Sequence, residues 1–194
     1  PNNTAAPITI NSVDMLDIGG KAYPTHDARI DASDRNTMYW STYKLDTWKE
    51  KGAKGGNLHV GKSNLATGDV IMDVAIAPPE RAKWTGANYC ASGQTATSFM
   101  PVSMANEGYI DVFDKKTMKL KHRVFLDALG IRAGETTFAH GINTPDMKKF
   151  LLTVNDTPMG FTKWTGNTRL YMLDMAALEQ GKIVKLQEAL ITGK

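Results

Sequence analysis

A repeated pattern along the chain constrains the fold more than any other feature of the sequence. Residues 28–43 and 140–155 align without gaps over 16 positions, and each reads as a short strand, a polar turn and an apolar strand. The turn has a physical cause, because Asp34 and Asp146 can accept hydrogen bonds from backbone amides two residues further on. Pro145 also presets the backbone angle that such a turn needs. Self-similarity of this kind indicates a fold built from repeated supersecondary units.

Each copy of the pattern is followed by a second unit that would complete a small sheet. A weaker third copy runs over residues 89–104, where the turn lacks the aspartate. The second units begin at Asn57, Gly108 and Asn167, and each consists of a strand ending at or near Asp or Asn, a polar turn and a closing strand. Side chains alternate over residues 109–113 with the period of two that a pleated strand requires. Two such hairpins in succession form one four-stranded antiparallel blade.

The sequence therefore predicts an all-β fold, a β-propeller of four-stranded antiparallel blades with about three blades in this chain. The blades are predicted at residues 25–76, 88–126 and 137–187, in a single partial propeller that covers residues 1–194. Residues 1–24 are expected to be an N-terminal segment with a strand of a neighbouring blade. Because propellers contain about 4–8 blades, three blades make only a partial ring.

The composition fits a globular domain and argues against a nucleic-acid partner. Hydrophobic residues make up 42% of the chain and charged residues 22%, which allows a core to form. The charge is nearly balanced, with 23 Lys and Arg against 20 Asp and Glu. A nucleic-acid surface needs cations gathered on one face. The densest group is interpreted instead as the solvated edge of a hairpin; its members are Lys115, Lys116, Lys119, Lys121 and Arg123.

Other features of the sequence bear on the compartment. No run of about 18 apolar residues occurs, so we expect no membrane span. The only cysteine, Cys90, excludes an internal disulfide framework, and there is no C-x-x-C-H motif for covalent haem attachment. The chain starts with Pro1 and a polar stretch at residues 2–7, as is found after removal of a signal peptide. We therefore expect an exported protein, periplasmic or extracellular.

The repeats resemble those of a known group of propellers. The residues that carry the likeness are His140 to Ile142, Pro145 to Asn155, and the Gly-Tyr-Ile-Asp-Val-Phe-Asp strand at Gly108 to Asp114. They resemble the YVTN-type and cytochrome-d1-like propellers, over about residues 25–186. That group includes exported scaffold proteins, the propellers of nitrite reductase and nitrous oxide reductase, and the haem-free propeller subunit of hydrazine synthase. The resemblance implies the fold; it does not choose between these activities.

Three residues are candidates for the mouth of the central channel. The innermost strand of each propeller blade faces the channel, which predicts that His26, Tyr89 and His140 gather there as cofactor contacts. Imidazoles suit copper, so His26 and His140 are also candidate metal ligands, and they could equally contact a haem or an anionic substrate. The alternative is that each is a hydrogen-bonded structural residue. No cofactor is assigned to these blades alone, and a haem or copper would come with other blades or a partner.

Three tryptophans are candidates for partner binding. Trp48, Trp84 and Trp164 each fall in or beside a long predicted loop, two of them within the similar contexts Lys-Trp-Thr-Gly. Exposed tryptophans on loops can anchor a protein partner. The alternative is that they cover hydrophobic edges of the blades.

Two main functional hypotheses remain open, and a third possibility is carbohydrate or peptide binding through the tryptophan loops. The first is an exported scaffold or interaction subunit in a redox or electron-transfer complex, whose protein partner is a cytochrome-type subunit or the remaining blades. The second is a copper- or haem-dependent oxidoreductase of nitrogen-oxide-type metabolism, with its cofactor at the channel mouth. Metal analysis and an optical spectrum of the purified protein separate the two.

Overall fold

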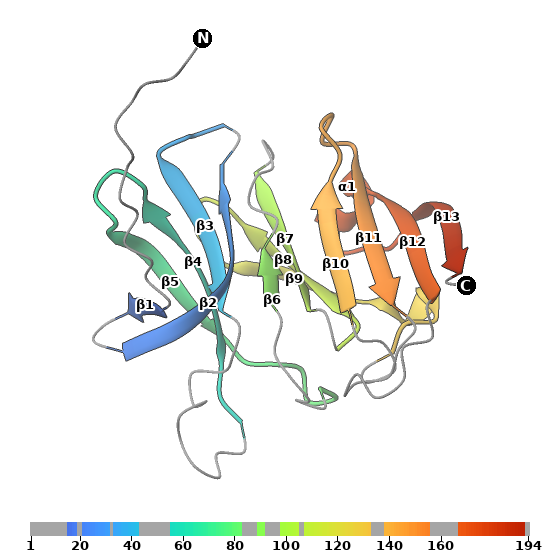
Figure 1. Ribbon diagram of the computed structural model, residues 1–194, viewed down its shortest axis with the longest axis horizontal. Coiled ribbons are helices and arrows are strands. Elements are labelled where there is room, and N and C mark those ends of the chain that lie inside the picture. Colours follow the sequence, from blue (N-terminus) through green and yellow to red (C-terminus); the bar gives the residue numbers. More distant parts are fainter. Residues whose placement is uncertain are drawn as a thin grey trace.

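The computed structural model contains three antiparallel sheets that stand side by side (Figure 1). It describes residues 15–18, 21–31, 33–42, 55–82, 89–91, 98–104, 107–132, 138–155 and 167–192. Each sheet pairs strands in the order in which they follow along the chain, as expected of propeller blades. The fold class predicted from the sequence, a partial β-propeller, is confirmed. None of the helices among the described residues is long and apolar enough to cross a membrane.

Blade 1 is the five-stranded sheet in the order β1-β2-β3-β4-β5. Its strands are β1 (Met15–Ile18), β2 (Lys21–Ile30), β3 (Thr37–Thr42), β4 (Leu58–Asn64) and β5 (Val70–Ile76). The long strand β2 has two partners, because its first residues pair with β1 and the rest pair with β3. Within the predicted N-terminal segment, β1 thus belongs to the sheet of blade 1. Residues 1–14 lie outside the described residues, so the strand of a neighbouring blade stays a prediction.

Blades 2 and 3 are four-stranded sheets. Blade 2 consists of β6 (Tyr89–Ala91), β7 (Phe99–Met104), β8 (Tyr109–Asp114) and β9 (Leu120–Phe125), followed by the short helix η1 (Leu126–Leu129). Blade 3 consists of β10 (Phe138–Asn143), β11 (Lys149–Asn155), β12 (Asn167–Asp174) and β13 (Lys185–Thr192), with helix α1 (Met175–Glu179) between its last two strands.

Aspartates shape the short turns, as the repeat predicts. Asp34 accepts hydrogen bonds from the Asn36 amide at 3.0 Å and from the Thr37 hydroxyl at 2.7 Å. Asp146 accepts one from the Lys148 amide at 3.1 Å. In both turns the hydrogen bonds to the charged carboxylate hold its pKa below the ordinary value, with the neighbouring threonine hydroxyl as the main cause.

The gap-free alignment of the two repeats does not extend to their pairing register. Ile30 pairs with Met38 in blade 1, whereas Ile142 pairs with Leu151 in blade 3, one position further along the second strand. Because side chains alternate between the faces of a sheet, a shift of one residue moves a side chain to the other face. Ile30 and Ile142 are therefore equivalent in sequence but lie on opposite faces of their blades.

Two apolar layers fill the spaces between the blades. Between blades 1 and 2, the layer is formed by alternate residues of the facing sheets, namely Tyr39, Leu58, Val60, Ile76, Met100, Val102, Tyr109, Phe113 and Met118. Between blades 2 and 3, residues such as Ile110 and Val112 pack against Leu152 and Tyr171. Strands β7 and β8 thus have buried side chains on both faces, as expected of a blade between two others.

Candidate functional site

The connections between strands divide the propeller into two ends. Short turns join β2 to β3, β4 to β5, β8 to β9 and β10 to β11 at one end, which we call the turn end. Longer connections join β3 to β4, β5 to β6, β9 to β10 and β11 to β12 at the opposite end, the loop end, while the connection between β12 and β13, which contains α1, is at the turn end (Figure 1). Antiparallel neighbours reverse direction at each step, so this division follows from the strand order alone.

The residues predicted at the channel mouth lie on the first strand of each blade, toward the loop end. His26 is on β2, Tyr89 on β6 and His140 on β10, and β2 contacts β6. Tyr89 pairs with Met104, the last residue of β7. His140 pairs with Thr153, near the end of β11. The structure describes the backbone of these strands, while the side chains of Tyr89 and His140 fall outside the described part. Their roles stay predictions.

His26 occupies an irregularity that the sequence does not reveal. The pairing of β2 with β3 shifts register between Thr25 and Asp27, so that His26 lies in a β-bulge. Its side chain is half-buried. Bulges redirect side chains and are frequent beside active sites. Within the part of the chain that the structure describes, no group of three or more His, Cys, Asp or Glu side chains is arranged to hold a metal ion.

The predicted tryptophan anchors lie outside the described residues, but the strand ends on either side of them are placed. The segment with Trp48 leaves β3 and enters β4, and the segment with Trp84 joins β5 to β6. The segment with Trp164 joins β11 to β12. All of these strand ends are at the loop end.

A hollow lies at the loop end, where the connection from blade 1 crosses onto blade 2. It has a volume of about 490 Å³ and is lined by Pro79, Glu80, Arg81 and Phe125. The Arg81 guanidinium lies 3.6 Å from the centre of the Phe125 ring, and its Nη2 donates to Asp127 Oδ2 at 2.6 Å. The hydrogen bond from Arg81 is the main cause that lowers the pKa of the Asp127 carboxyl.

A buried ion pair fixes the same connection to the outer strand of blade 2. Arg123 Nε and Nη2 donate to the two oxygens of Asp111, each at 2.7 Å, and Nη1 donates to the Ala77 carbonyl at 3.1 Å. The Asp111 side chain is fully buried. The Arg123 guanidinium also lies 4.8 Å from the centre of the Tyr109 ring. Burial is the main cause that raises the pKa of the Tyr109 hydroxyl, which has no hydrogen-bond partner among the described residues.

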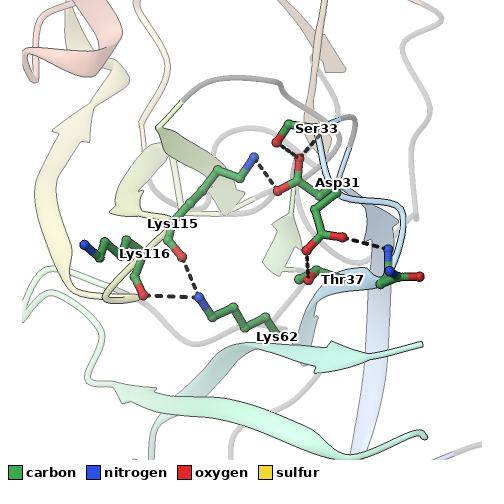
Figure 2. A network of polar contacts seen from close by, with 8 residues as sticks. Asp31, Ser33, Thr37, Lys62, Lys115 and Lys116 are labelled. Atoms are coloured by element: carbon green, nitrogen blue, oxygen red, sulfur yellow. Dashed lines mark hydrogen bonds and ion pairs between the residues drawn. The ribbon is translucent and has the colours of Figure 1, made fainter. Parts of the chain in front are cut away.

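At the turn end, blades 1 and 2 are joined by a polar network (Figure 2). Lys115 Nζ, from the turn after β8, lies 2.9 Å from Asp31 Oδ2, and both side chains are only 6% exposed. The other oxygen of Asp31 accepts hydrogen bonds from the Ser33 amide and hydroxyl. From β4, Lys62 Nζ donates to the carbonyls of Lys115 and Lys116 at 3.0 and 3.1 Å. This network thus links the two blades through side chains from each of them, Asp31 and Lys62 from blade 1 and Lys115 from blade 2.

The network corrects the interpretation of the cation group as a solvated hairpin edge. Lys115 is buried against blade 1, and the side chain of Arg123 is only 17% exposed. Lys116, Lys119 and Lys121 are exposed, as expected. Asp31 is distant from Lys115 in the sequence, and Asp111 lies on the strand next to that of Arg123. The spacing of the cations along the sequence therefore predicts neither contact.

The Asp31–Lys115 pair is expected to make stability depend on pH. Burial alone would raise the pKa of Asp31, but the hydrogen bonds from Lys115 and Ser33 outweigh it and hold the pKa below the ordinary value of 3.8. The resulting stability is present in full above that ordinary value and is lost as the pH falls through the lower, folded value.

We therefore expect Lys115→Met to lower the free energy of unfolding by about 1–3 kcal/mol near neutral pH. The difference in the free energy of unfolding between the variant and the natural chain should be constant from about pH 5 to 8 and should become smaller below about pH 4. Urea unfolding at a series of pH values measures this. Lys116→Met, a change at the exposed neighbouring lysine, is the matched control. A deficit that stays constant down to acid pH would contradict the role of Asp31.

Comparisons with known proteins support the fold of this chain and do not assign a function to it. No model of a protein family matches the chain, and no curated protein is significantly similar to it in sequence. Among solved structures, the Dos1 propeller is similar over 88% of this chain and 38% of its own, with 15% identity and a TM-score of 0.52. The dihydro-heme d1 dehydrogenase NirN in complex with DHE matches over 81% and 28%, with 13% identity and a TM-score of 0.47. The hydrazine synthase of Kuenenia stuttgartiensis matches over 87% and 49%, with 11% identity and a TM-score of 0.47. The chain thus spans less than half the length of these proteins, and the likeness to the Dos1 propeller supports the β-propeller fold.

Proposed function

We propose that this chain is part of an exported β-propeller scaffold whose loop end binds a protein partner in a redox or electron-transfer complex. The observation that supports the proposal is that three of the long connections are at the loop end. Residues 43–57, 77–88 and 156–166 leave from and return to the loop end, and each contains one of the predicted tryptophan anchors. Long loops held by a rigid scaffold are where binding residues concentrate.

The described part of the loop end is suited to such a role. The apolar layers between the blades and the Asp111–Arg123 pair hold the connection at Ala77 in place. Arg81 and Phe125 then present a stacked guanidinium and ring beside an open hollow. Arginine and aromatic side chains are enriched among the residues that dominate protein interfaces. A surface that is fixed before binding loses less entropy when the partner docks.

The class of the partner is taken from the sequence resemblance alone. The YVTN-type and cytochrome-d1-like propellers include subunits of redox complexes, so a cytochrome-type protein is the partner that we propose. The Arg81 guanidinium and the Phe125 ring would then contact its surface.

Site-specific photo-crosslinking tests this proposal. A photoreactive phenylalanine is placed at the exposed loop-end residues Glu80 and Ala128, and at the exposed turn-end residues Ala66 and Lys116 as matched controls. In the native cells we expect the loop-end positions to give one adduct that contains a haem protein, and the turn-end positions to give none. Capture from the turn end alone, or equal capture from both ends, would contradict binding at the loop end. An adduct with a partner that carries no redox group would contradict the redox assignment.

A second candidate function, a redox enzyme, is favoured by the β-bulge at His26. A bulge on the first strand of a blade can turn an imidazole toward a ligand on the channel axis. In that case the purified protein should hold stoichiometric copper or show a haem Soret band, and His26→Ala should remove most of the metal or shift the band. Elemental analysis and an absorption spectrum decide the question. A colourless protein without metal would exclude this function for the chain.

A further inference from the structure

One face of blade 3 carries apolar side chains that nothing described covers. The face lies on the side of the blade away from blade 2, and we call it the open face. Its apolar residues, from four strands, are Ile142, Leu151, Leu170, Met172 and Ile191.

Strand pairing places these residues on a common face. Leu151 stands between Ile142 of β10 and Met172 of β12. Ile191 of β13 pairs with Thr168 on the same side of β12. The opposite side of these strands carries Leu152 and Tyr171, which are buried against blade 2. Residues directly paired across a sheet share a face, so the open face is a continuous surface of one sheet.

The corresponding faces of the other two blades are covered. On blade 1, Leu58 and Val60 face blade 2 and are fully buried. On blade 2, Ile110 and Val112 face blade 3 and are fully buried as well. On blade 3, by contrast, the corresponding residues of β12, Leu170 and Met172, are only half-buried, and Ile142 of β10 is 46% exposed.

The outer strand of blade 3 shows the same difference. Ile191 is 53% exposed, and every residue of β13 from Lys185 to Thr192 is exposed. The outer strands β5 and β9 each contain a residue buried against the following blade, Ile76 and Val124 respectively. The open face of blade 3 is thus the counterpart of the apolar faces with which blades 1 and 2 contact the blade that follows them.

Blade 1 of a second copy offers only a partly matching surface. The face of blade 1 that points away from blade 2 carries Trp40 and His59, which are 0% and 6% exposed. Trp40 Nε1 donates to Ser63 Oγ at 3.0 Å, and His59 Nδ1 lies 2.7 Å from Asp73 Oδ1. Trp40 and His59 are thus already covered, and Ile30, on the same face, is 51% exposed.

We propose that the open face receives a fourth four-stranded blade supplied from outside residues 1–194. The facing strands of that blade carry aromatic or aliphatic side chains at alternate positions, as Phe150, Leu152 and Val154 do where blade 3 meets blade 2. The alternation follows from the pleat of a strand. A contiguous exposed apolar surface of this kind marks an interaction site.

Neighbouring residues of β13 provide a matched pair of probes. Ile191 and Leu190 are 53% and 58% exposed, and they point to opposite faces because Ile191 pairs with Thr168 and Leu190 with Arg169. In a Cys90→Ala background, Ile191→Cys reports on the open face and Leu190→Cys on the other side of the same strand.

The test supplies a fourth blade by fusing a second copy of residues 126–192, which include blade 3 and the connection before it, after Lys194. Alkylation of Ile191→Cys in the original blade should slow by about tenfold or more in the fused protein, because the thiol reacts only when the interface opens. Leu190→Cys should react at an unchanged rate. Changing Leu152 and Val154 to aspartate in the added copy alone should restore fast labelling of Ile191→Cys.

Two results would overturn the proposal. One is that the added blade leaves labelling of Ile191→Cys unchanged or slows Leu190→Cys equally. The other is that the unfused chain sediments as a dimer in which Ile191→Cys, but not Leu190→Cys, is protected. In that case the open face binds a second copy of the chain.

Discussion

Replacing Arg123 by methionine is expected to lower the free energy of unfolding by about 3–5 kcal/mol, the cost of leaving a buried charge without its partner. Asp111 is fully buried and receives two hydrogen bonds from Arg123, each 2.7 Å long. The change also removes the donor to the Ala77 carbonyl. Urea unfolding monitored by circular dichroism measures the loss.

A double variant separates the lost pair from lost packing. Replacing Asp111 by leucine together with Arg123→Met removes both charges and keeps apolar volume, so it should recover much of the stability lost in the single variant. If the loss of stability in the double variant equals the sum of the losses caused by Arg123→Met alone and Asp111→Leu alone, the two side chains do not act as a pair. Lys121→Met, at an exposed cation of the same strand, should change stability little.

Truncation of Trp40 to alanine should cost about 3–5 kcal/mol. The side chain is 0% exposed and lies over Gly61, where a Cβ atom would overlap both the Trp40 ring and the Met72 carbonyl oxygen. Its indole nitrogen also donates to Ser63 Oγ. The cavity and the unpaired Ser63 hydroxyl should both contribute to the loss, which urea unfolding measures.

Two further variants test how tightly this contact is packed. Trp40→Phe keeps a ring over Gly61 and should cost clearly less than Trp40→Ala, with about 1 kcal/mol from the lost hydrogen bond. Gly61→Ala adds a single methyl group under the ring and should destabilise by about 1–3 kcal/mol. Tolerance of Gly61→Ala without any loss would mean that Trp40 is not held against β4.

The sequence was informative where structure depends on neighbours along the chain. The turns at Asp34 and Asp146 were predictable because the side chain bonds to an amide two residues away. The succession of strands and turns was predictable for the same reason, and it led to the propeller fold. The placement of His26, Tyr89 and His140 on the first strands of the blades follows from that fold.

Features that depend on strand pairing were not predictable in this way. The β-bulge at His26 arises from the pairing of β2 with β3, and the different registers of Ile30 and Ile142 arise from the geometry of each hairpin. The contact of Lys115 with Asp31 joins residues of different blades. Lys115 therefore looked like any other member of a cation group, since no local pattern distinguishes a buried lysine from an exposed one.

The buried Lys115–Asp31 pair has a consequence for the order in which similar blades assemble. Repeat proteins are prone to misassembly, because one unit can pack where another belongs. Lys115 directly follows Asp114 at the end of β8, and the residue in the same place after Asp174 of β12 is Met175. If blade 2 stacked against any sheet other than blade 1, the ammonium group of Lys115 would be buried without a carboxylate, which is strongly unfavourable. The pair thus favours the stacking of blade 2 on blade 1 and disfavours its stacking on any other sheet.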